Sequence, residues 1–214
     1  MSVKLKFQDC KRLVALWSQI GARSDPGKAL HEVFDYYKEP HRFYHNLNHI
    51  LKMLHEFDRA RSLCVHPNEV EFAIWFHDAI YDPKAKDNEE LSAELAVATL
   101  REAHVGAPFR ERVRALILAT KHTAAPVGPD ASVLVDADLS ILGKPAAEFD
   151  AYEATIRKEY AWVSDDAFRS GRAAVLRQFL GRPRIYSTEL FFGLYENAAR
   201  ANIARSLEAL GKKG

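Results

Sequence analysis

The sequence predicts an all-α fold. Apolar residues recur at three- and four-residue steps along most of the 214-residue chain, which is the spacing of amphipathic helices. Pro, Gly and small polar residues separate these segments, at positions where helices begin and end. The apolar run 133–135 has the composition of a strand, but a lone strand would have no partner in this chain. The length suits one domain, so we expect residues 1–214 to form a single helical domain.

The first two helices are predicted from apolar spacing and from the prolines beside them. Residues 5–20 carry one apolar face, and the glycine that follows ends this helix. Pro26 suits the first turn of the second helix after a cap at Ser24 or Asp25, and Pro40 ends it. The expected inner faces are Leu5, Leu13, Leu16, Trp17 and Ile20, and then Leu30, Val33, Phe34 and Tyr37.

The third and fourth helices carry the histidines on which the functional interpretation depends. We expect the third helix over residues 44–63, with His45 and His49 one turn apart and therefore on one face. Pro67 is expected to open the fourth helix, which ends at the adjacent pair His77-Asp78. The connection is short, which favours antiparallel packing and brings the two sets of side chains together.

The remaining helices are predicted from caps and prolines. We expect the segment 132–143 to be helical, and the helix before it to extend to His122. Acidic residues follow the expected start near residue 88, which suits the positive end of a helix dipole. The expected starts lie at Asp87 or Asn88, Pro108, Pro145, Ser164, and Ser187 or Thr188.

Composition limits the possible partners. Lys and Arg number 30 and Asp and Glu 29, so no overall charge attracts nucleic acid or an anionic membrane. No apolar run approaches the roughly 20 residues of a membrane span, and the two cysteines lack metal-ligand spacing. We expect a cytoplasmic protein that binds neither nucleic acid nor membrane. Phe191, Phe192 and Tyr195 could belong to the core or to the face of a homodimer.

The histidines beside apolar stripes indicate a metal site. An imidazole without a partner would be costly near the core, and a ligand role explains the placement of His49 and His77. Asp78 is expected at a helix C-terminus, where the helix dipole disfavours negative charge unless a cation lies nearby. Imidazole nitrogens and carboxylate oxygens together suit Zn, Mn, Fe, Co or Ni, and a more oxygen-rich site would suit Mg.

The order of these residues resembles a known family. His49 is followed by His77-Asp78 and, far downstream, by Asp136-Ala137-Asp138-Leu139. This pattern is similar to the HD superfamily of metal-dependent phosphohydrolases, whose signature is a His, a His-Asp pair and a distant Asp. The phrases YHNLNH, WFHDAIYD and DNEELSA also resemble one bacterial branch of predicted phosphohydrolases in that superfamily. The setting of Asp138 is close to the family pattern but does not match it letter for letter.

The resemblance implies a fold and a ligand set. It implies an HD-domain-like helical bundle with a core at about 43–143 and flanking N- and C-terminal helices. The implied metal ligands are His49, His77, Asp78 and Asp138. Asp136 would then be a structural acid or would support the ligands.

Three further residues are catalytic candidates. His122 could bind phosphate, protonate the leaving group or hold a second metal; its alternative is a helix-terminal His interacting with the dipole. Glu89 could orient or deprotonate water, with Glu90 beside it, although both also suit an ordinary helix N-terminus. Asp82 is the third candidate acid.

A phosphorylated substrate also requires local cations. Arg42, just before the third helix, and Lys121, beside His122, are the expected phosphate-binding residues. His45 is a candidate for substrate contact, and a capping or core-edge role is its alternative. We therefore expect metal-activated water to attack a phosphate ester or anhydride of a small molecule such as a nucleotide.

Two other functions compete with this hypothesis. Some relatives in the superfamily are di-iron oxygenases, and His104 and His122 could supply the additional ligands for two irons. A non-catalytic regulator that binds metal or nucleotide is the third possibility, and the complete ligand set argues against it.

Overall fold

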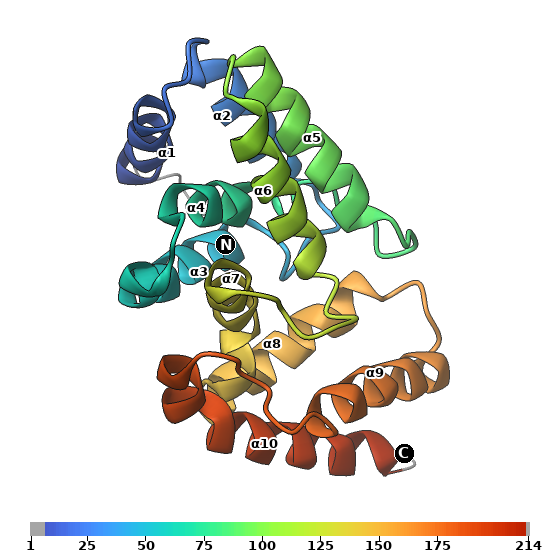
Figure 1. Cartoon of the computed structure of the whole chain (residues 1–214). Coiled ribbons are helices and arrows are strands. Elements are labelled where there is room, and N and C mark those ends of the chain that lie inside the picture. The colour runs from blue at the N-terminus through green and yellow to red at the C-terminus, as the bar shows by residue number, and fades with distance from the viewer. Residues whose placement is uncertain (1–6, 213–214) are drawn as a thin grey trace. The chain divides into compact units, whose positions relative to one another are not determined.

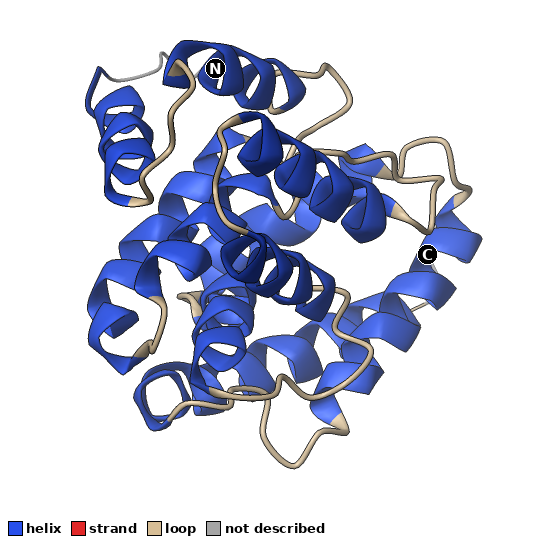
Figure 2. Ribbon diagram, turned by 45° about the horizontal axis from the view of Figure 1, so that its top comes forward, coloured by secondary structure: helices blue, strands red, loops and turns tan. Residues whose placement is uncertain are grey.

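The computed structural model describes residues 7–212. Within this range helices joined by loops make up the chain, and there is no strand (Figure 1, Figure 2). The predicted all-α fold class is therefore confirmed; the expected core residue Leu5 lies outside the described residues. The α-helices are α1 Phe7–Gln19, α2 Pro26–Tyr36, α3 Leu47–Ala60, α4 Pro67–Phe76, α5 Asn88–Glu102, α6 Ala107–Ala119, α7 Pro129–Leu139, α8 Ala146–Glu159, α9 Asp165–Leu180 and α10 Glu189–Gly211. Two short 3₁₀ helices, η1 Arg61–Leu63 and η2 Ser140–Gly143, follow α3 and α7.

The chain divides into two compact units, one ending at Val135 and the other beginning at Asp136. The division falls inside α7, so this helix begins in the first unit and ends in the second. The helix expected over 132–143 is confirmed as α7 followed by η2. The expectation of a single domain stays a prediction. In the described part of the chain, no helix is both long and apolar enough to span a membrane.

The first unit is built around α4. This helix contacts α1, α3, α5 and α6, and every residue from Glu69 to Phe76 is buried. A helix buried on all sides lacks a polar face. Its two glutamates are paired instead: Glu69 with Arg112, and Glu71 with Arg12 and Arg61. The end of α4, which carries His77, is therefore held firmly in the core.

Side-chain caps fix several helix starts. Asp25, Ser164 and Thr188 accept hydrogen bonds from the first turns of α2, α9 and α10, as their residue types predicted. Asn46 accepts the N–H of Asn48 and so begins α3 at Leu47. The predicted start at residue 44 was therefore wrong, and His45 lies in the turn before α3.

In the second unit η2 contacts α8 and α10, and α9 packs against α10. Gly143 in η2 lies so close to α10 that a β-carbon there would be 2.5 Å from the Cβ of Tyr195, which requires glycine. Phe191 and Tyr195 are buried and belong to the core of this unit, whereas Phe192 is partly exposed with the Arg184 guanidinium 3.8 Å from its ring centre.

Candidate metal centre

Two buried imidazoles meet at the ends of α3 and α4. His49 lies in the first turn of α3, and His77 follows the last residue of α4. Their side chains are 2% and 1% exposed, and their Nε2 atoms are 3.2 Å apart. The two histidines expected to converge do so, because α3 and α4 pack against each other.

The hydrogen bond of Nδ1 of His77 determines which ring nitrogen is available to bind a metal ion. Nδ1 lies 3.0 Å from the carbonyl oxygen of Ile74, so we assign the proton to Nδ1 as the donor. Nε2 is then the ring atom left for a ligand role, and it can bind a metal ion only after it loses its proton. A hydrogen bond from the distal ring nitrogen to a carbonyl is the usual support for a histidine that binds metal.

Asp78 completes a compact donor set. Its Oδ2 lies 3.1 Å from Nε2 of His77 and 3.5 Å from Nε2 of His49. Burial raises the pKa of this carboxyl, but the charge and hydrogen bond of His77, with His45 and His49, lower it further, so the net pKa is depressed. The carboxylate is therefore present as an anion, ready to bind a cation.

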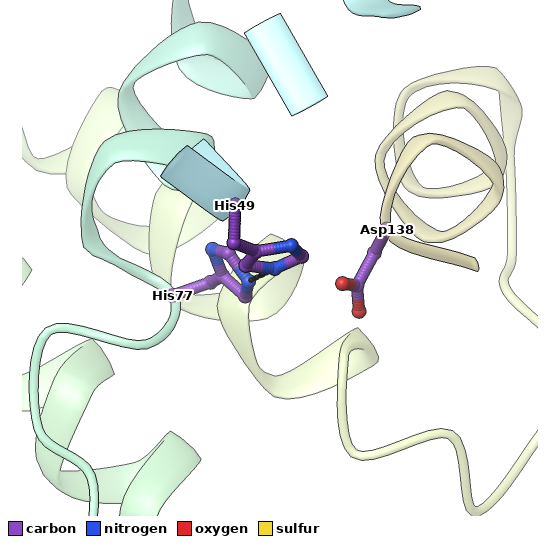
Figure 3. A group of neighbouring side chains, drawn as sticks. All are labelled: His49, His77 and Asp138. Carbon is purple, nitrogen blue, oxygen red and sulfur yellow. Dashed lines mark hydrogen bonds between the residues drawn. The ribbon is translucent and has the colours of Figure 1, made fainter. Parts of the chain in front are cut away.

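The fourth expected ligand, Asp138, lies on the last turn of α7. Asp138 belongs to the second compact unit and the two histidines to the first, so its role as a fourth ligand stays a prediction. Figure 3 shows the imidazoles of His49 and His77 side by side. Two donors on one zinc-like ion are separated by at most about 4.2 Å, because each bond measures about 2.1 Å. The distances among His49, His77 and Asp78 fit that limit, so this donor set could hold a divalent ion.

Arg42 has a different role from the one expected. Its guanidinium is fully buried and donates to the carbonyl oxygens of His45 (3.1 Å), Asp78 (2.6 Å) and Ala79 (2.8 Å), and to Glu39 (2.8 Å). These contacts leave it little capacity for a phosphate. The structure therefore assigns Arg42 to bracing the backbone around Asp78, and we no longer expect it to bind substrate.

This brace gives a first prediction. Arg42→Met should lower the free energy of unfolding by about 3 kcal/mol, because several buried acceptors lose their donor. It should also weaken metal binding, since the backbone of Asp78 loses its support. Chemical denaturation and metal titration measure the two effects. Arg101→Met, at an exposed position on α5, is the matched control and should change neither quantity; an Arg42→Met protein of unaltered stability would contradict the assignment.

Aromatic rings surround the histidine pair. The ring of His45 stacks on that of Tyr81 at 4.3 Å between centroids, and the ring of Tyr44 lies 4.8 Å from that of His49. His45 thus lies beside His49, 6.0 Å between ring centres, although it does not share its helix. Its packing against Tyr81 agrees with the structural alternative; substrate contact by His45 stays a prediction.

Hydrogen bonds attach the start of α5 to the loop after Asp78. Ser92 Oγ bonds the N–H (3.0 Å) and the carbonyl oxygen (3.2 Å) of Ile80, and the Asn88 amide bonds both backbone groups of Asp82. The Asp82 carboxylate accepts the N–H of Lys84 in an exposed turn, which is a structural use. The candidate acids Glu89 and Glu90 therefore occupy the helical turn that is fixed to this loop.

Glu90, rather than Glu89, contacts the candidate cation. The Lys121 ammonium forms an ion pair with Oε1 of Glu90, joining the start of α5 to the end of α6. Their hydrogen bond lowers the pKa of Glu90 and raises that of Lys121, so both groups are charged. Oε2 of Glu90 is shielded from solvent and has no hydrogen-bond partner among residues 7–212. Sequence spacing did not distinguish the two glutamates, because only the packing of α5 on α6 reveals the pair.

The two remaining histidines follow helix ends. The helix α6 ends at Ala119, earlier than expected, and His122 follows with a φ of +55°. His104 is exposed and follows the opposite end of α5 from Glu90, with a φ of +59°. That helix has 15 residues and is about 22 Å long, so its length separates His104 from the loop after Asp78. His104 is therefore poorly placed to supply a ligand for a second iron.

Asp136 is a structural acid, one of the two roles expected for it. Its carboxylate accepts the N–H of Ser187 (2.8 Å) and both the N–H and the hydroxyl of Thr188 (2.7 Å each). Thr188 in turn caps α10. Burial raises the pKa of Asp136, against the lowering effect of these hydrogen bonds. Asp136 is thus occupied by the start of α10, and the ligand role of Asp138 stays a prediction.

Comparisons with family models, with curated proteins and with solved structures each find no match for this chain. The resemblance to the HD superfamily therefore stays a prediction based on the residues quoted above. The functional argument depends on the chemistry of the described side chains.

Proposed function

We propose that this protein is a metal-dependent phosphohydrolase of the HD type. The observation that carries the proposal is the convergence of two buried imidazoles and one partly buried carboxylate within a single compact unit. Burying two imidazoles and a carboxylate together costs free energy unless their polar atoms have partners. A divalent ion bound by all three removes that cost.

The surrounding residues would then have separate tasks. A bound divalent ion would acidify a coordinated water and offset charge on a phosphoryl oxygen. His49, His77 and Asp78 hold the ion, with the Ile74 carbonyl fixing the ring of His77 and Arg42 bracing the backbone of Asp78. Lys121 supplies the local positive charge that an anionic substrate requires. His122 remains the candidate proton donor to the leaving group.

A phosphate-release screen tests the proposal. Nucleotides and sugar phosphates would be incubated with the protein and Mn, Co, Ni, Fe, Zn or Mg in turn, with inorganic phosphate and pyrophosphate as the readouts. We expect turnover that depends on the metal and stops with a chelator. Binding of nucleotide without turnover under every metal would favour the regulatory alternative. Two irons per chain together with oxygen consumption would favour the oxygenase.

The two glutamates of α5 give a second prediction. Glu90→Gln should lower kcat by about 100-fold, the scale of a lost acid or base contribution, because Lys121 loses the carboxylate that holds it. Glu89→Gln is the matched control and should reduce kcat by less than about threefold. Both variants should keep the helical circular dichroism of the parent. A larger loss in Glu89→Gln than in Glu90→Gln would reverse this assignment.

A further inference from the structure

A cavity lies in the first unit, apart from the candidate metal ligands. It has a volume of about 480 Å³ and is lined by one side of α6 from Arg112 to Ala119, by residues 123–128, by the start of α7, and by Val65 and His66. This volume falls within the roughly 300–1,000 Å³ of pockets that bind small molecules. None of the predicted catalytic, substrate-binding or metal-binding residues lines it.

The wall of the cavity is mainly apolar. Alanines, leucines and prolines of α6 and of the following loop form most of it. At its edges Val65 and Val127 are 66% and 92% exposed, which is high for side chains of this type. The surface is therefore suited to an apolar body.

The acids near this cavity already have donors. Asp130 accepts the N–H groups of Val65 (2.7 Å) and His66 (3.2 Å), and the His66 ring nitrogen Nδ1 at 2.9 Å. Glu69, beneath it, accepts two hydrogen bonds from Arg112, at 3.1 and 2.7 Å. Both carboxylates are thus matched by positive or N–H groups, and their negative charge is offset locally.

Arg112, which lines the cavity, has hydrogen-bond donors that are not used by Glu69. Only Nε and Nη2 of Arg112 bind Glu69, so its Nη1 has two N–H groups without an acceptor among the described residues. A guanidinium prefers the planar, two-oxygen geometry of a carboxylate. The matching occupant has an apolar body and one carboxylate.

We propose that this cavity is a binding site for small monocarboxylates with an apolar body, with Arg112 binding the carboxylate and the α6 face packing against the body. The site does not involve the metal ligands, so the test of this proposal does not depend on whether the protein is a hydrolase. The ligand would also contact His66 and Asp130, which join the start of α4 to the start of α7.

Isothermal titration with octanoate tests the site. We expect saturable binding of one octanoate per chain, with 1-octanol at least about tenfold weaker because it lacks the charged head. Arg112→Lys keeps a positive partner for Glu69 but loses the second pair of N–H groups, and should weaken octanoate about tenfold while leaving octanol unchanged. The matched control Arg110→Lys, on the same helix but outside the lining, should bind octanoate like the parent.

Filling the cavity provides the location test. Ala115→Phe on α6 should weaken octanoate binding at least about tenfold. Ala125→Trp does the same from an exposed loop position, where a large side chain does not disturb folding, and it decides the result if Ala115→Phe fails to fold. No saturable octanoate binding, equal affinity for octanol, or unchanged binding in a folded cavity-filling variant would each overturn the proposal.

Discussion

Replacement of His77 by alanine is expected to abolish metal binding and phosphate release together. Nε2 of His77 lies within 3.2 Å of both the His49 nitrogen and the Asp78 oxygen, so its loss removes the central donor of the set. Loss of a supporting group alone costs 10- to 100-fold in metal affinity or activity, and a direct ligand should cost at least about 100-fold. Metal titration by calorimetry and the phosphate-release assay measure the two effects.

Two controls separate this loss from unfolding. His55→Ala removes an exposed histidine from α3 and should leave metal binding and turnover intact. His77→Gln keeps a side chain of similar size in the core, and should retain the helical circular dichroism of the parent while lacking activity. Metal-dependent turnover in either His77 variant would remove the proposed mechanism.

Substitutions of Asp136 and Asp138, in the last turns of α7, are expected to have opposite effects. Asp136→Ala should lower the free energy of unfolding by about 3 kcal/mol, because the N–H groups of Ser187 and Thr188 lose their acceptor and α10 loses its anchor. Asp138→Ala should change stability little but weaken metal affinity at least about tenfold. Thermal and urea unfolding of the metal-free variants, with metal titration of each, measures the contrast.

This pair is its own matched control, since the same substitution is made two residues apart on one helix. A destabilised Asp138→Ala protein with normal metal affinity would show that Asp138 is structural. Normal stability of Asp136→Ala would show that its hydrogen bonds to the start of α10 contribute little.

Much of the fold followed from local sequence signals. Caps at Asp25, Ser164 and Thr188 were predicted from residue type, because a cap needs only a side-chain oxygen beside the first helical turn. The helix over 132–143 was inferred from the lack of any partner strand, and α7 with η2 confirms it. The convergence of His49 and His77 followed from the short connection between their helices.

The roles of charged residues were harder to predict. Arg42 was expected to bind phosphate, but its guanidinium donates to carbonyl groups 36 and 37 residues away. Sequence spacing does not reveal these contacts. Glu90 could not be separated from Glu89 until the partner on α6 was known. The start of α3 was misplaced because Asn46 was not recognised as the cap, and His45 was then assigned to the wrong element.

The position of α7 also determines which fragments of this protein keep all the expected ligands. An N-terminal fragment that stops at Val135, where the compact units divide, would lose Asp138 and the last turn of the helix that carries it. A fragment intended to keep the full ligand set has to extend at least through Leu139. It would then carry Asp136 without Ser187 and Thr188, so this carboxylate would face water and its raised pKa should return toward the ordinary aspartate range.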